Sequence, residues 1–160
     1  MKEIKIESTF YVFDALTHLP EDVQQLMKKA AKARQKAYAP YSNFNVGAAL
    51  LLDNGEIITG SNQENASYPS GLCAERTAIY YKGAQFPEAK ILKMAIIAGS
   101  MNKPTTTPIP PCGACRQAIA EYEINQDLPI EIYFTGETGK VVQSNSLANL
   151  LPLVFDKSVL

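Results

Sequence analysis

The sequence predicts an α/β domain in which helices pack on a central sheet. Apolar, strand-like runs alternate with helical segments along the chain, and this alternation is typical of layered α/β folds. The length of 160 residues suits one continuous core. With 46% hydrophobic and 19% charged residues, the composition is that of an ordinary globular protein. Because no repeat or linker is visible, we expect a single domain over residues 1–160.

The first half of the chain predicts a strand, a helix and a hairpin. Residues 4–13 alternate charged or polar with apolar side chains and predict a strand. A proline and two acidic residues then begin a helix predicted over 21–37. The apolar run 46–52 predicts a buried strand. The turn signal Asp53-Asn54-Gly55 joins it to a returning strand over 56–60.

The second half predicts two helices that begin at cysteines, and two apolar strands. The helices cover 73–82 and 112–122, and the strands cover 91–98 and 130–134. The proline- and threonine-rich segment before the second helix must be a loop. The remaining predictions are loops over 62–71 and 100–111, a short strand at 141–142 and a short helix over 146–151.

The charge balance favours small, neutral ligands over nucleic acids or membranes. Fifteen basic and 16 acidic residues give a net charge of −1, and no long basic run is present to hold a phosphate backbone. The start of the chain lacks the apolar region of a signal peptide. No window reaches the roughly 18 apolar residues of a membrane span. We therefore expect a cytoplasmic protein.

Three cysteines predict a metal site with one open position. Cys112 and Cys115 form a CxxC pair at a helix start, where two sulfurs can reach one ion. A closed zinc site needs a fourth ligand, and the only histidine, His18, lies next to no motif. Adding Cys73 gives three thiolates and room for water, as in catalytic zinc sites. A redox dithiol is the alternative for the CxxC pair, but it leaves Cys73 without a role.

Charged residues beside the cysteines are candidates for acid–base chemistry and charge balance. Glu75 follows Cys73 in the same helical turn and can move a proton beside the metal. Its alternative is a glutamate that only complements the helix dipole. Three thiolates around Zn²⁺ leave a formal charge of −1, which Arg76 can offset by donating to a sulfur. Arg116 has the same possible role, and either arginine could instead be an exposed surface residue.

The motifs together resemble the free-nucleoside branch of the cytidine deaminase family. A three-cysteine zinc site, a glutamate that is not a ligand and a PCxxC element form the known signature of zinc deaminases. The resemblance covers about Pro40 to Phe155. The segments that carry it are Tyr41–Phe44, Val46–Leu50, Asn62–Pro69, Cys73–Ala78, Pro111–Gln117, and Leu150–Pro152 with Phe155.

The resemblance implies a three-layer α/β/α fold with a mixed central sheet, one zinc ion per chain and a homotetramer. Zinc would be held by Cys73, Cys112 and Cys115, with Glu75 as the catalytic proton carrier. Residues 1–18 are expected to be an N-terminal extension, because they match none of the family's motifs. Asn45, where the family often has proline, and the tail after Phe155, which lacks the family's Gly-Pro step, are departures from the pattern.

The resemblance also implies substrate contacts. Asn62 and Glu64 would hydrogen-bond the ribose hydroxyls, Phe44 would pack against the base, and the Ala74 backbone N–H would face the pyrimidine carbonyl. Two aromatic residues would reach a neighbouring subunit's site, namely Tyr68 and Phe155. By residue type alone, Asn62 and Glu64 could be turn residues, and Phe44 and Phe155 could be core residues.

The implied function is zinc-dependent hydrolysis of cytidine and 2′-deoxycytidine to uridine and 2′-deoxyuridine, in pyrimidine salvage. One alternative is deamination of a cytosine nucleoside antibiotic such as blasticidin S, against which the Asn62–Asn65 stretch argues. Deamination within polynucleotides is disfavoured by the near-neutral charge. A zinc-binding structural module without turnover would need a fourth protein ligand.

Overall fold

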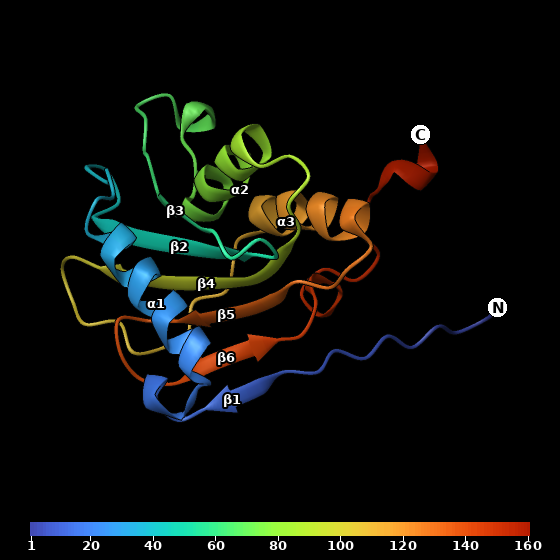
Figure 1. Ribbon diagram of the computed structural model, residues 1–160, viewed down its shortest axis with the longest axis horizontal. Coiled ribbons are helices and arrows are strands. Elements are labelled where there is room, and N and C mark those ends of the chain that lie inside the picture. Colours follow the sequence, from blue (N-terminus) through green and yellow to red (C-terminus); the bar gives the residue numbers. More distant parts are fainter.

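One six-stranded mixed sheet forms the centre of the computed structural model, which describes all residues from 1 to 160 (Figure 1). Its strands are β1 (Tyr11–Phe13), β2 (Phe44–Leu52), β3 (Ile57–Ser61), β4 (Ile91–Ser100), β5 (Glu131–Thr135) and β6 (Val141–Ser144). Their order across the sheet is β1-β6-β5-β4-β2-β3. Only β4 and β5 are parallel neighbours, and every other pair is antiparallel.

Three α-helices cover the two faces of this sheet, which confirms the three-layer arrangement (Figure 1). Helix α1 (Glu21–Arg34) packs on one face, and α2 (Ala74–Gln85) and α3 (Gly113–Gln126) lie together on the other. None of the helices is long and apolar enough to cross a membrane. Short 3-10 helices occupy Leu16–His18, Tyr68–Ser70, Leu147–Asn149 and Lys157–Val159.

The strands are apolar on both sides because both faces of the sheet are covered. Along β4, Met94 and Ile96 point to the core beneath α2 and α3. The alternate residues Ala95 and Ile97 point to the core beneath α1. This period of two explains why the strand runs read as continuous apolar segments rather than as alternating ones.

Two glycines allow a helix to approach each face of the sheet closely. A Cβ atom on Gly47 of β2 would overlap the Ala30 carbonyl oxygen and the Arg34 nitrogen of α1. A Cβ atom on Gly60 of β3 would lie 2.5 Å from the Ala74 oxygen of α2. Contacts this short leave no room for a side chain, so glycine is required where each helix crosses the sheet.

Several element boundaries differ from the predictions. The predicted strand over 4–13 is paired only at Tyr11–Phe13, because its partner β6 ends after four residues. The predicted helix over 21–37 ends at Arg34 in a tight turn, after which Tyr38 N–H donates to the Asn62 carbonyl instead. The helix predicted over 112–122 continues to Gln126, whose side chain bonds both backbone groups of Ile91. The predicted helix over 146–151 is a single 3-10 turn.

Candidate active site

The three cysteines form one cluster at the start of two helices. Cys73 and Cys112 are the N-cap residues of α2 and α3, and Cys115 lies in the first turn of α3. Their sulfur atoms all lie within 4.8 Å of one another, and the Cys73–Cys112 distance is 3.8 Å. A tetrahedral zinc ion with Zn–S bonds near 2.3 Å places its sulfurs about 3.8 Å apart. The thiol positions therefore fit one zinc ion, and no histidine or carboxylate completes the group.

The strand directions bring these cysteines together. β3 and β4 both run antiparallel to β2, so their carboxyl ends lie at the same edge of the sheet. α2 follows β3 and α3 follows β4, and both helices lie on the same face. Their N-termini consequently meet beyond that edge, where α/β folds commonly place ligands.

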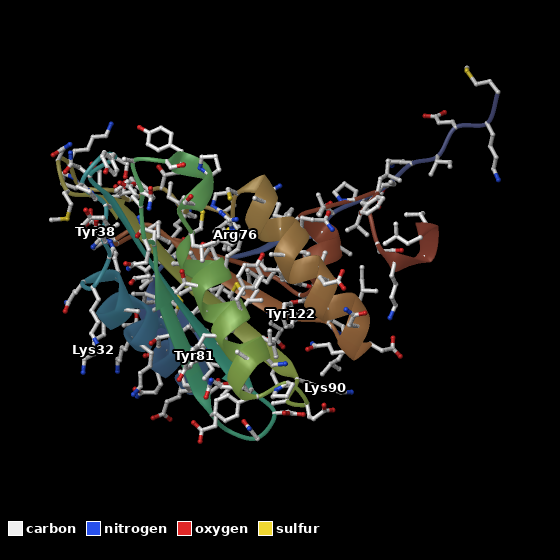
Figure 2. All side chains as sticks on the ribbon, turned by 90° about the horizontal axis from the view of Figure 1, so that it is seen from above. Lys32, Tyr38, Arg76, Tyr81, Lys90 and Tyr122 are labelled. Carbon is white, nitrogen blue, oxygen red and sulfur yellow. The ribbon has the colours of Figure 1, made fainter.

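The cluster stabilises negative charge on sulfur. Both helix N-termini favour a thiolate. The pKa of Cys73 is lowered to about 5, mainly by the hydrogen bond with Cys115 and also by Arg76. The same bond raises the pKa of Cys115. Arg76 lies between α2 and α3 (Figure 2), and its Nη2 donates to Cys73 Sγ over 3.9 Å. The structure thus has the arginine–sulfur contact that the sequence predicted.

Glu75 is a buried carboxyl beside the thiols. Its residue is only 4% exposed, and burial raises its pKa to about 7. That value includes a smaller rise from the charge of Cys73, which the hydrogen bonds with the backbone and with Cys115 partly offset. Located in the first turn of α2, Glu75 faces the cluster rather than solvent. A carboxyl held this way can take up and release a proton next to the metal site.

A cavity of about 420 Å³ opens beside Cys73. It is large enough for a small ligand. Five of the predicted site residues line it: Asn62, Glu64, Tyr68, Cys73 and Arg76. A larger hollow of about 600 Å³ lies along α2 and α3 and shares Arg76, but no cysteine lines it. The cavity that contains a thiol is therefore the candidate substrate site.

Asn62 and Glu64 organise the wall of this cavity. The Glu64 carboxylate accepts bonds from the Ser42 hydroxyl and from the backbone N–H groups of Tyr41 and Ser42. The Ser42 hydroxyl is the main cause that lowers the pKa of Glu64. Asn62 is 7% exposed and bonds both Phe44 O and Val46 N at 2.9 and 2.8 Å. Both residues fix the chain that enters β2.

Comparison with known proteins decides the family. A sequence model described as the cytidine and deoxycytidylate deaminase zinc-binding region matches residues 20–128. The chain belongs to this deaminase family. A cytidine deaminase from Sporosarcina psychrophila is 42% identical over 136 residues, which cover 85% of this chain and 93% of that protein. The resemblance inferred from the motifs is thereby confirmed, and residues 1–18 lie outside the matched region.

Solved structures of cytidine deaminases have the same fold as this deaminase. The enzyme from Burkholderia pseudomallei has 38% sequence identity and a TM-score of 0.71, with 86% of this chain and 100% of that chain covered. The enzyme from Mycobacterium tuberculosis has 31% identity and a TM-score of 0.66, covering 86% and 99%. The zinc-binding description of the family agrees with the three-cysteine cluster.

Six predicted site residues of the deaminase do not line the cavity next to Cys73, namely the thiols Cys112 and Cys115 and four others. Phe44 is half-buried at the start of β2, and Ala74 is fully buried at the start of α2. Glu75 is buried in the first turn of α2. Phe155 is 62% exposed on the C-terminal tail, where its carbonyl accepts a bond from Gln117. Tyr68 does line the cavity, but it is 75% exposed and packs edge-on against Tyr41.

Two contacts of the deaminase site were not predicted from its sequence. Arg116 does not donate to sulfur; its Nε donates to Pro111 O and its Nη1 to Leu150 O, both at 2.8 Å. It thereby fastens the loop before Cys112 to the C-terminal tail. Ser42 supports Glu64, and its only sequence signal was its place in the Tyr41–Phe44 motif.

Proposed function

We propose that this chain hydrolyses the C4 amino group of cytidine and 2′-deoxycytidine, giving uridine or 2′-deoxyuridine and ammonia. The observation that carries the proposal is the open three-thiol cluster with a buried carboxyl beside it, next to a 420 Å³ cavity. Family membership supports the reaction class, and relatives 42% identical are cytidine deaminases.

The metal site would be formed by Cys73, Cys112 and Cys115. When bound there, zinc acts as a Lewis acid that makes a water molecule acidic enough to supply a nucleophile. Arg76 partly neutralises the thiolates through its contact with Cys73. Since the cysteines supply only three ligands, one position stays available for chemistry.

Glu75 would be the catalytic acid and base. Its carboxylate would take one proton from the attacking water and deliver it to N3 of the pyrimidine, and would then carry the second proton of that water to the amine that leaves C4. Burial keeps bulk water away from this carboxyl, because the residue is only 4% exposed. Over the cycle water adds at C4 and ammonia leaves, so the carboxyl returns to its initial state.

The nucleoside would be held by residues around the cavity. Asn62 and Glu64 would bond the ribose hydroxyls, using the lone pairs and hydrogens that their bonds to the entering β2 chain leave free. Phe44 would pack on the base, and the Ala74 backbone would face the pyrimidine carbonyl. Polar groups buried at such a site penalise ligands that leave them unpaired.

The assembly and setting belong to the same proposal. Tyr68 and Phe155 would complete a neighbouring subunit's site in a homotetramer, and their exposure of 75% and 62% supports this role. The three zinc ligands must remain reduced thiols, which supports a cytoplasmic enzyme of pyrimidine salvage. Light scattering of the purified protein tests the tetramer, and a monomer mass would contradict it.

The reaction is tested by zinc content and ultraviolet absorbance. We expect one zinc per chain and a spectral change on cytidine and deoxycytidine, with ammonia released in equal amount. Glu75→Gln should keep the zinc and lose turnover, because an amide cannot carry the proton. Stoichiometric zinc with no change on either nucleoside would favour a structural module. Turnover of blasticidin S alone would favour an antibiotic deaminase.

A further inference from the structure

Arg34 and Glu137 form a largely buried ion pair next to the candidate site. Arg34 is the last residue of α1, and Glu137 follows β5. Their Nη2 and Oε1 atoms are 2.8 Å apart, and their side chains are only 18% and 29% exposed. The two residues are 103 positions apart in the chain. A pair shielded from water in this way is weakened little by salt.

Arg34 also holds two strands by their backbones. Its Nε donates to Asn45 O of β2 at 3.0 Å, and its Nη2 donates to Gly99 O of β4 at 3.1 Å. The planar guanidinium can make these bonds together with the Glu137 contact, whereas a lysine ammonium is a point charge that cannot match this geometry.

The Arg34 contact lies in the middle of the segment that carries Phe44. Asn62 bonds Phe44 O and Val46 N on either side of Asn45. Met101 N donates to Asn43 O at 2.7 Å, and Asn43 has a left-handed φ of 51°. The backbone that carries Phe44 is therefore held by bonds on both sides of this residue.

Glu137 holds the loop that leads to the metal ligands. Its Oε2 accepts from Thr105 N at 3.0 Å, and its own N–H donates to Thr105 O at 2.7 Å. Thr105 Oγ1 in turn accepts from Ser100 N at the end of β4. The loop runs from there to Pro111, which Arg116 holds, and then to Cys112. One ion pair thus links the Phe44 segment to the loop before the metal cluster.

Gly99 leaves the space that this pair occupies. A Cβ atom at Gly99 would overlap Glu137 Cγ and lie 2.7 Å from Glu137 Cδ and 2.9 Å from Arg34 Nη2. Any side chain at this position would displace both partners. The requirement for glycine in β4 is therefore explained by the ion pair.

We propose that Arg34 and Glu137 are positioning residues that hold the Phe44 segment and the loop 101–111 in the substrate-binding arrangement. The inference rests on the proposed function for the role of Phe44. Neither residue lines the cavity, so the pair acts through the backbone that it holds. Its loss should weaken nucleoside binding more than the chemical step.

A second ion pair at the other end of α1 is a matched control. Lys93 of β4 bonds Asp22 of α1 at 2.8 Å, and the Lys93 side chain is 21% exposed. Residues 22 and 34 lie twelve positions apart on the helix, or about 18 Å. Both pairs involve α1 and a residue at or beside a sheet strand, but only Arg34–Glu137 bonds the backbone next to Phe44.

The test compares zinc-loaded Arg34→Lys and Glu137→Gln with Lys93→Gln. For the two site variants we expect KM for cytidine to rise about tenfold, with kcat within about twofold and one zinc per chain retained. Lys93→Gln should lower the unfolding midpoint without changing KM. An equal KM change in all three variants, or no KM change in the site variants, would overturn the proposal.

Hydrogen exchange gives a readout that does not depend on turnover. Arg34→Lys should speed exchange of the Val46, Met101 and Thr105 amides, which are bonded in the network, but not of amides in β5. Unchanged exchange at these three amides would overturn the positioning role. If the parent protein does not deaminate cytidine while this exchange pattern appears, the proposed function fails and the structural link remains.

Discussion

The helices that cover the two faces of the sheet point in opposite directions at the site. α2 and α3 present their N-termini to the site edge, and α1 presents its C-terminus. The N-terminal ends hold thiols, and the C-terminal end holds the Arg34 guanidinium. Each end therefore carries the charge that complements its helix dipole.

We call the face under α2 and α3 the chemical face, and the face under α1 the supporting face. The face under α2 and α3 has the ligands and Glu75 directly in its first helical turns. The face under α1 contributes an apolar core that includes Val23, Leu26 and Met27, and Arg34 links it to the backbone beside Phe44. We expect substitutions on the first face to abolish activity and substitutions on the second to cost mainly stability.

The largest effect is expected from Cys115→Ser on the chemical face. Cys115 is fully buried, and its loss leaves only two thiolates in the cluster. Two ligands hold zinc far less tightly than three, so bound zinc and turnover should both disappear. Zinc per chain after dialysis is the measurement. His18→Ala is the control and should keep both, since His18 is not in the metal group.

A Cys115→Ser protein that keeps one zinc and deaminates cytidine would contradict the assigned metal site. It would also leave Cys112 as the only predicted ligand on α3, which would weaken the distinction between the two faces.

The sequence predicted the chemical face better than the supporting one. Cys73, Cys112 and Cys115 lie in short motifs at helix starts, and local spacing was enough to predict their cluster. The Arg34–Glu137 bond joins residues 103 positions apart, and it depends on the strand order, which no local pattern encodes. Arg116 was misjudged for the same reason, because its partner Leu150 comes near only in the folded chain.

The N-terminal prediction failed for a related reason. Residues 4–10 have the alternation of a strand, but a strand needs a neighbour, and β6 is only long enough to pair with Tyr11–Phe13. The alternation of side chains is a property of one segment, whereas the pairing of a strand also depends on the length of the neighbouring strand.

The next largest effect is expected from Leu26→Ala on the supporting face. Leu26 is 1% exposed in the core beneath α1. Removing its buried methyl groups leaves a cavity and should lower the free energy of unfolding by about 2–5 kcal/mol. Zinc content and the kcat of the folded enzyme should stay unchanged. Urea unfolding measures the change in stability, and steady-state kinetics measures kcat. If the variant were fully folded but had lost its zinc, the proposed division of roles between the two faces would be wrong.

The smallest effect is expected from Asp22→Asn, at the end of α1 away from the site. The hydrogen bond from Lys93 lowers the pKa of Asp22. Asp22 is half exposed, so the contact should stabilise the protein by less than about 1 kcal/mol at pH 7. Lys93 retains Glu131 at 3.6 Å, which limits the loss further.

The sign of its pH dependence follows from the direction of that shift. Because the folded pKa lies below the unfolded value of about 3.9, the contribution is present above that pH and is lost as the pH falls through the folded pKa. The difference in urea midpoint between the parent and Asp22→Asn should therefore shrink below about pH 4. Any zinc released by acid affects both proteins equally and cancels in this difference. A gap that widens on acidification would show that Asp22 is not stabilised by Lys93.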